Sequence, residues 1–174
     1  MRVNYIGKKL HAQGPGIRYT LWTQGCSIHC PGCSNKDTWD FSAGSNYSVK
    51  ELADDILSTE GINGLTITGG EPLDQFDEVY ELCKLVFDKM SIFLTTGYQD
   101  INLEQMKIIS VLDILCKGPF KIDKICKDGW RGSSNQEVCI LTKRGKLEQE
   151  KYPPVYKEII VSPKGNAIET GFHI

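Results

Sequence analysis

A chain of 174 residues has the size of a single domain, spanning residues 1–174, and is shorter than the roughly 250 residues of a complete eight-fold βα barrel. Its 20 basic and 22 acidic residues give a net charge of -2 and a pI near 5.9, which excludes the basic surface typical of nucleic-acid-binding proteins. No segment reaches the roughly 18 apolar residues of a membrane span, and residues 1–24 lack an apolar run of signal-peptide length, so we expect a cytoplasmic protein outside the membrane.

The first predicted core strand covers residues 17–24, which are rich in β-branched and aromatic side chains and end at Gly25. A helix is predicted next. Ser48 and Glu51 have the spacing of a capping box, and the apolar residues that follow recur on one helical face. A strand that ends in a loop and is followed by a helix is the first sign of an α/β fold.

Strands and helices continue to alternate along the chain. Residues 65–68, 91–95 and 111–115 are short apolar runs that predict buried strands. Residues 75–89 have the apolar spacing of a helix, and residues 103–109 predict a shorter one. This alternation predicts an α/β protein with a mostly parallel sheet.

The pattern changes after Gly118. Residues 121–135 are rich in turn-forming residues and predict a loop on the active side of the sheet rather than a linker. Residues 138–142 and 158–161 predict closing strands, and the polar stretch 142–151 connects them.

Three cysteines, Cys26, Cys30 and Cys33, follow the first predicted strand with the spacing C-x-x-x-C-x-x-C. Clustered thiolates favour zinc, copper(I) or an iron–sulfur cluster. Three thiolates are one fewer than a closed site needs, so a cubane cluster held by them keeps one iron open for chemistry. The spacing therefore predicts a reactive iron–sulfur site.

The alternative is a zinc-binding module without catalysis, in which His29 supplies the fourth ligand. Three unrelated buried cysteines are disfavoured because Gly25, Pro31 and Gly32 indicate a loop. The remaining cysteines show no paired spacing: we expect core packing for Cys83, Cys116 and Cys139 and an exposed thiol at Cys126.

A second loop reads Gly69-Gly70-Glu71-Pro72, directly after the predicted strand 65–68. Glycine amides can approach a ligand closely, and the Glu71 carboxylate can accept hydrogen bonds from an amine. Strand ends on one edge of an open parallel sheet converge on one crevice. We therefore expect this loop to lie beside the cysteine loop.

The three cysteines followed by Gly-Gly-Glu-Pro resemble the radical S-adenosylmethionine superfamily. Longer matches resemble the activating enzymes of anaerobic (class III) ribonucleotide reductase. They cover residues 14–18, 22–26, 30–39 and 131–136.

The resemblance implies an open, partial βα barrel of the radical S-adenosylmethionine type. It also implies that Cys26, Cys30 and Cys33 bind a [4Fe-4S] cluster whose fourth iron is chelated by S-adenosylmethionine. The residues implied to contact that cofactor are Gly32, Cys33 and Ser34, the amine-binding Gly69, Gly70 and Glu71, and Thr95, Thr96 and Gly97 at the next strand end.

The implied function is cleavage of S-adenosylmethionine to a 5′-deoxyadenosyl radical that generates a glycyl radical on an anaerobic ribonucleotide reductase. The implied partners are this large glycyl-radical subunit and a reducing electron-transfer protein. Two alternatives stay open: a small radical S-adenosylmethionine enzyme acting on another peptide or small molecule, and the zinc-binding module.

Overall fold

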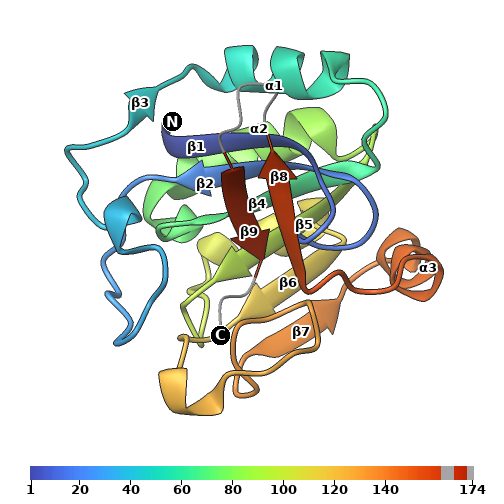
Figure 1. The fold of residues 1–174 in the computed structure, drawn as a ribbon. Helices are drawn as coiled ribbons and strands as arrows, with labels where there is room; N and C mark the ends of the chain where they lie inside the picture. The colour runs from blue at the N-terminus through green and yellow to red at the C-terminus, as the bar shows by residue number, and fades with distance from the viewer. Residues whose placement is uncertain (162–166, 172–174) are drawn as a thin grey trace.

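The computed structural model of the protein describes residues 1–161 and 167–171. Its centre is a seven-stranded sheet with the order β3-β1-β2-β4-β5-β6-β7 (Figure 1). The strands are β1 (Arg2–Leu10), β2 (Arg18–Thr23), β3 (Ser45–Asn46), β4 (Gly64–Gly69), β5 (Ser91–Thr96), β6 (Ile114–Lys117) and β7 (Glu137–Ile140). Strands β2, β4, β5 and β6 are parallel, whereas β1, β3 and β7 pair antiparallel at the two sides. The predicted α/β class is confirmed, but the sheet is mixed.

Helices α1 (Val49–Ser58) and α2 (Phe76–Val86) cover one face of the sheet. The predicted capping box is present, because the Glu51 amide donates to Ser48 Oγ and the Ser48 amide donates to the Glu51 carboxylate. The predicted inner face of α2 is buried against the strands. The core on this side includes Leu21, Leu65, Ile67, Ile92 and Leu94 from the sheet and Leu52, Ile56, Val79, Leu82, Cys83 and Val86 from the helices.

Short 3₁₀ helices occupy several connections: Lys36–Thr38, Pro72–Gln75, Gln105–Val111 and Ile122–Lys124. The third replaces the helix predicted over 103–109. Its buried residues Ile108 and Val111 are three apart, which is the repeat of a 3₁₀ helix and gives too little apolar surface for a longer α-helix. The following strand accordingly starts at Ile114, later than the predicted 111–115.

Other elements also differ from the prediction. Strand β1 lies outside the predicted set, and helix α3 (Lys143–Lys151) forms within the stretch 142–151 that was predicted as a connection, with Thr142 Oγ1 accepting a hydrogen bond from the Gly145 amide. The predicted strand at 158–161 exists as β8 (Lys157–Val161), but its role in closing the sheet was wrong. It pairs with β9 (Ala167–Gly171) in a separate hairpin.

The β8–β9 hairpin lies in front of β2, β4 and β5 (Figure 1), on the face opposite α1 and α2. Glu158 Oε1 accepts hydrogen bonds from the amides of His11 and Ala12, each at 2.8 Å, and Gln13 Nε2 donates to Thr170 Oγ1 at 2.6 Å. The hairpin is therefore attached to the β1–β2 connection.

Among the described residues, no helix combines the length and apolar character needed to cross a bilayer.

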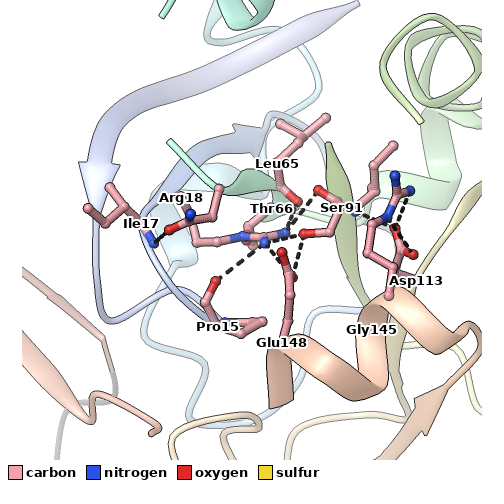
Figure 2. Close-up of polar contacts among 12 residues, drawn as sticks. Pro15, Ile17, Arg18, Leu65, Thr66, Ser91, Asp113, Gly145 and Glu148 are labelled. Carbon is pink, nitrogen blue, oxygen red and sulfur yellow. Dashed lines mark hydrogen bonds and ion pairs between the residues drawn. The ribbon is translucent and has the colours of Figure 1, made fainter. Parts of the chain in front are cut away.

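Helix α3 is joined to the sheet by a buried polar network around Arg18 (Figure 2). Arg18 begins β2, its side chain is fully buried, and its Nη1 lies 3.3 Å from Glu148 Oε2 of α3. The same guanidinium donates to Ser91 Oγ at 2.7 Å, to the Leu65 carbonyl oxygen at 2.5 Å and to Thr66 Oγ1 at 3.1 Å. These contacts connect the starts of β2, β4 and β5 to α3.

Candidate functional site

A cavity of about 510 Å³ lies on the sheet face opposite α1 and α2. Alternate residues of a strand point to opposite faces, so β4 presents Thr66 and Thr68 to the cavity while Leu65 and Ile67 enter the core. Phe93 and Thr95 of β5 line it in the same way. Further parts of the wall come from the cysteine loop, from the Gly-Gly-Glu turn, from residues 129–132 and from residues 169–171 of the hairpin.

The cysteine loop starts where β2 ends, and Cys26, Cys30 and Cys33 all line the cavity. Cys26 is buried, while Cys30 and Cys33 are half-buried. The chain turns sharply at Gly25 and Gly32, which have φ values of 99° and 78° that favour glycine. The loop is then tied to the 3₁₀ helix after it, because Gly25 donates to the Thr38 carbonyl at 2.8 Å and Cys26 to the Trp39 carbonyl at 3.2 Å.

Two opposing effects act on the pKa values of Cys26 and Cys30. Burial raises the pKa of Cys26 and of Cys30, and Cys33 and Cys26 add to the rise at Cys30 because negative charges would then lie close together. Backbone amides oppose this: those of His29 and Ile28 face the Cys26 sulfur, and that of Phe120 faces the Cys30 sulfur. Binding to a metal centre would remove the proton and relieve the repulsion between thiolates.

The donor set suits an iron–sulfur cluster, because three cysteines line one cavity and thiolates favour such clusters. Within residues 1–161 and 167–171, no three His, Cys, Asp or Glu side chains converge as ligands of one metal ion. The His29 ring, which the zinc alternative needs as a ligand, is stacked on Trp39 with 4.4 Å between ring centroids.

The Gly-Gly-Glu turn ends β4 and lies directly against the start of the cysteine loop. The Gly70 amide donates to the Thr23 carbonyl at 2.9 Å, and the Glu71 amide donates to the Gly25 carbonyl at 2.8 Å. A Cβ at Gly70 would collide with that Gly25 carbonyl, and one at Gly69 would collide with the backbone of Trp22. The predicted juxtaposition of the two loops is confirmed, and both glycines are required by close packing.

Glu71 is a buried carboxyl group, 1% exposed, at the edge of the cavity. Its Oε1 accepts hydrogen bonds from Thr96 Oγ1 at 2.7 Å and the Leu73 amide at 2.9 Å, and its Oε2 accepts one from the Gly97 amide at 2.7 Å. Burial raises its pKa to about 7, against the lowering effect of these hydrogen bonds. No basic side chain among the described residues forms an ion pair with it, so a cationic ligand would be well placed there.

The raised pKa of Glu71 predicts that the free energy of unfolding of the protein depends on pH. Because its pKa rises from 4.5 to about 7 on folding, the folded state holds a proton that the unfolded state releases between these values. Its contribution to stability is therefore complete below pH 4.5 and is lost as the pH rises to 7, by up to about 3 kcal/mol.

This is tested by urea unfolding of the cluster-free protein and its Glu71→Gln variant from pH 4.5 to 7.5. The difference in unfolding free energy between the two proteins should change across this window in favour of the variant at the higher pH. Parallel curves for the two proteins would contradict the raised pKa.

Most of the predicted site residues meet at this cavity. The predicted residues that line the cavity are Cys26, Cys30, Cys33, Ser34, Gly69, Gly70, Glu71, Thr95, Thr96 and Gly97. Gly32 lies outside the lining residues and backs onto the side chain of Ile122. The convergence is a structural finding, and the ligand role of each residue stays a prediction.

Several lining residues were missed from the sequence. Thr68 lines the cavity and accepts a hydrogen bond from Thr95 Oγ1 at 2.7 Å. The sequence signal for it was the pair of threonines at alternate positions, 66 and 68, in an otherwise apolar strand. Cys116, expected only to pack, is buried in the wall, and Trp130 covers Phe93 with 6.1 Å between ring centroids.

Comparison with known proteins agrees with this site. Residues 12–139 match a protein family described as a 4Fe-4S single cluster domain. An anaerobic ribonucleoside-triphosphate reductase-activating protein of Enterobacteria phage T4 is 35% identical over 133 residues, covering 72% of this chain and 85% of its own. The protein of that name from Escherichia coli (strain K12) is 36% identical over 143 residues, covering 72% and 89%.

Among solved structures, that of QueE from Escherichia coli aligns with a TM-score of 0.42 and 24% identity over 55% of this chain and 52% of that chain, too low a likeness to bear on the fold. The sequence relatives are decisive, because each is matched over most of its length at more than 30% identity. This chain belongs to the family of anaerobic ribonucleoside-triphosphate reductase-activating proteins.

Proposed function

We propose that the protein is a radical S-adenosylmethionine enzyme that generates a glycyl radical on an anaerobic ribonucleoside-triphosphate reductase. One observation carries the proposal: three cysteine thiols and a buried carboxyl group on a glycine turn border a single cavity. The names of the relatives supply the reductase as the partner. The whole chain is proposed to act as one domain.

We also propose that the fold is an open, partial βα barrel. This fold suits the four parallel strands β2, β4, β5 and β6 and the cavity on their inner face. The carboxyl ends of these strands supply the cysteine loop, the Gly-Gly-Glu turn and Thr96-Gly97. This is the edge where open parallel sheets place their ligands.

Cys26, Cys30 and Cys33 would hold the [4Fe-4S] cluster, and the remaining iron would bind S-adenosylmethionine. When bound, these two groups would supply one-electron reductive cleavage of the sulfonium, the chemistry that precedes hydrogen abstraction from the substrate. The chain itself contributes position and charge. Glu71 would hold the amine of S-adenosylmethionine, Gly69 and Gly70 would permit its close approach, and Ser34, Thr95 and Thr96 would offer hydroxyl groups.

The hairpin and the loop before β7 would shield the cavity from water and side reactions. Both lie on the side that the sheet leaves open, with Thr170 and Gly171 on one wall and Gly129, Trp130 and Arg131 on another. A glycine segment of the reductase has to reach the cavity past these elements. An electron-transfer protein would reduce the cluster from outside.

The proposal is tested by anaerobic reconstitution with iron and sulfide, followed by reduction and addition of S-adenosylmethionine and the reductase. We expect 5′-deoxyadenosine and the EPR signal of a glycyl radical on the reductase. A reductase whose radical glycine is changed to alanine serves as the control and should give no such signal. Production of 5′-deoxyadenosine without a glycyl radical would instead favour an enzyme for another substrate.

A further inference from the structure

Asp74 forms a compact hydrogen-bond network with Ser27 and Tyr98. Its Oδ2 accepts a hydrogen bond from the Ser27 amide at 2.7 Å. Its Oδ1 accepts one from Tyr98 Oη at 2.7 Å and one from Ser27 Oγ at 3.0 Å. The two hydroxyl oxygens are themselves 2.9 Å apart. Both carboxylate oxygens are thus engaged by two segments far apart in the sequence.

These segments are the ones that build the proposed site. Ser27 follows Cys26, and Tyr98 follows Gly97, whose amide donates to Glu71. Asp74 itself belongs to the 3₁₀ helix Pro72–Gln75, which begins directly after Glu71. Asp74, Ser27 and Tyr98 are absent from the cavity lining, so the network supports the site from behind rather than touching a ligand.

Asp74 also brings a negative charge close to Cys26. The Ser27 amide that donates to Asp74 Oδ2 belongs to the peptide bond that directly follows Cys26. Among the described residues, no lysine, arginine or histidine forms an ion pair with Asp74. The half-buried carboxylate is therefore held by neutral donors beside the first cysteine.

We propose that Asp74 is a positioning residue that fixes Cys26 relative to Glu71 and keeps a negative charge beside the cluster. This inference rests on the proposed function, because it requires a cluster on Cys26. Two consequences follow. The charge should lower the reduction potential of the cluster, since an added electron is repelled. The hydrogen bonds should hold the cluster and the amine-binding turn at the spacing that S-adenosylmethionine needs.

Two variants separate charge from position. Asp74→Asn removes the charge and replaces one acceptor oxygen with an NH₂ donor, whereas Tyr98→Phe removes one hydrogen bond and keeps the carboxylate. Asp77→Asn is the matched control, because Asp77 is an exposed carboxylate at the start of α2. Each reconstituted protein is assayed for iron content, for the midpoint potential of the cluster, and for the S-adenosylmethionine concentration that produces half of the EPR change.

We expect Asp74→Asn to shift the midpoint potential to more positive values and to need about tenfold more S-adenosylmethionine, the size of a lost hydrogen bond to a charged group. Tyr98→Phe should also need more S-adenosylmethionine while its potential stays close to that of the unmodified protein. Asp77→Asn should match the unmodified protein in both.

The proposal is overturned if Asp74→Asn keeps both the unmodified potential and the unmodified S-adenosylmethionine dependence. If Asp74→Asn takes up no iron, Tyr98→Phe decides: an unchanged S-adenosylmethionine dependence overturns the proposal, and a weakened one supports it. Failure of the proposed function looks different, because the unmodified protein would then show no EPR change on addition of S-adenosylmethionine.

Discussion

Cys30→Ala is expected to lose the iron–sulfur cluster and, with it, cleavage of S-adenosylmethionine. The thiol lies between Cys26 and Cys33 in sequence, lines the same cavity and is faced by the Phe120 amide. In the proposed site, removing it would leave two cysteine ligands for a cluster whose fourth iron has no protein ligand. Loss of groups that merely orient a metal ligand costs roughly 10- to 100-fold in affinity or activity. Loss of the ligand itself should therefore exceed about 100-fold.

The measurement is iron and sulfide content after anaerobic reconstitution, with 5′-deoxyadenosine formation as the activity. Cys126→Ala is the matched control. Its thiol is half-buried in the loop before β7, lies 3.7 Å from Asp128 Oδ2 and 3.6 Å from the Arg131 carbonyl oxygen, and is not among the cavity-lining residues. It should keep its cluster and activity. An active, iron-replete Cys30→Ala protein would refute the assignment of the cluster ligands.

The parts of the fold that could be predicted are those in which local pattern and final environment agree. Strands β4 and β5 are recognisable because one of their faces packs against the helices while the other lines the cavity, and α2 has one apolar face because only one side meets the sheet. The start of α1 is fixed by the Ser48–Glu51 capping box. Each of these signals lies within a few residues, so no knowledge of distant partners was needed.

The remaining elements depend on partners that are distant in sequence. Strand β1 contains Lys8, Lys9 and a glycine, and becomes a strand through its pairing with β2. Helix α3 is strongly polar and buries only Gly145, so its sequence has no apolar face to reveal it. Strand β8 was recognisable as a strand, but a five-residue run does not specify its partner, and it joins β9 instead of the main sheet.

The residues of the candidate site also differ in how far the sequence predicts them. Cys26 and Glu71 could be placed side by side because both follow adjacent parallel strands, and this topology brings strand ends together. Thr68 has only the weaker signal of a threonine two residues after Thr66, and its hydrogen bond from Thr95 depends on the pairing of β4 with β5. Asp74 is one carboxylate among many in the sequence, and its role depends on the positions of Ser27 and Tyr98 in space.

The second large expected effect is a loss of stability when the polar network around Arg18 (Figure 2) is broken. Arg18 is fully buried, and burial lowers its pKa to about 10 while Glu148 and Asp113 oppose that shift, so the side chain is ionised at neutral pH. Glu148 also accepts a hydrogen bond from Ser91 Oγ at 2.5 Å. A second buried carboxylate, Asp113, is paired with Arg144 at 2.8 Å. The charges in this region are matched, and removing one of them leaves its partner unpaired.

Arg18→Met should lower the free energy of unfolding by about 3–5 kcal/mol, measured by urea unfolding of the cluster-free protein. The methionine fills part of the space, but Glu148, 14% exposed, loses its cation, and the Leu65 carbonyl and Thr66 hydroxyl lose a donor. Adding Glu148→Gln should recover part of the loss, because the unpaired charge is then removed and the two changes are not additive.

Lys50→Met is the control for loss of an ion pair at the surface. Lys50 and Asp54 are 81% and 63% exposed, so breaking this pair should change stability by less than about 1 kcal/mol. If Arg18→Met were no more destabilising than Lys50→Met, the buried network would not be what holds α3 against β2, β4 and β5. If instead the loss is large and Glu148→Gln restores part of it, the unpaired carboxylate is its main cause.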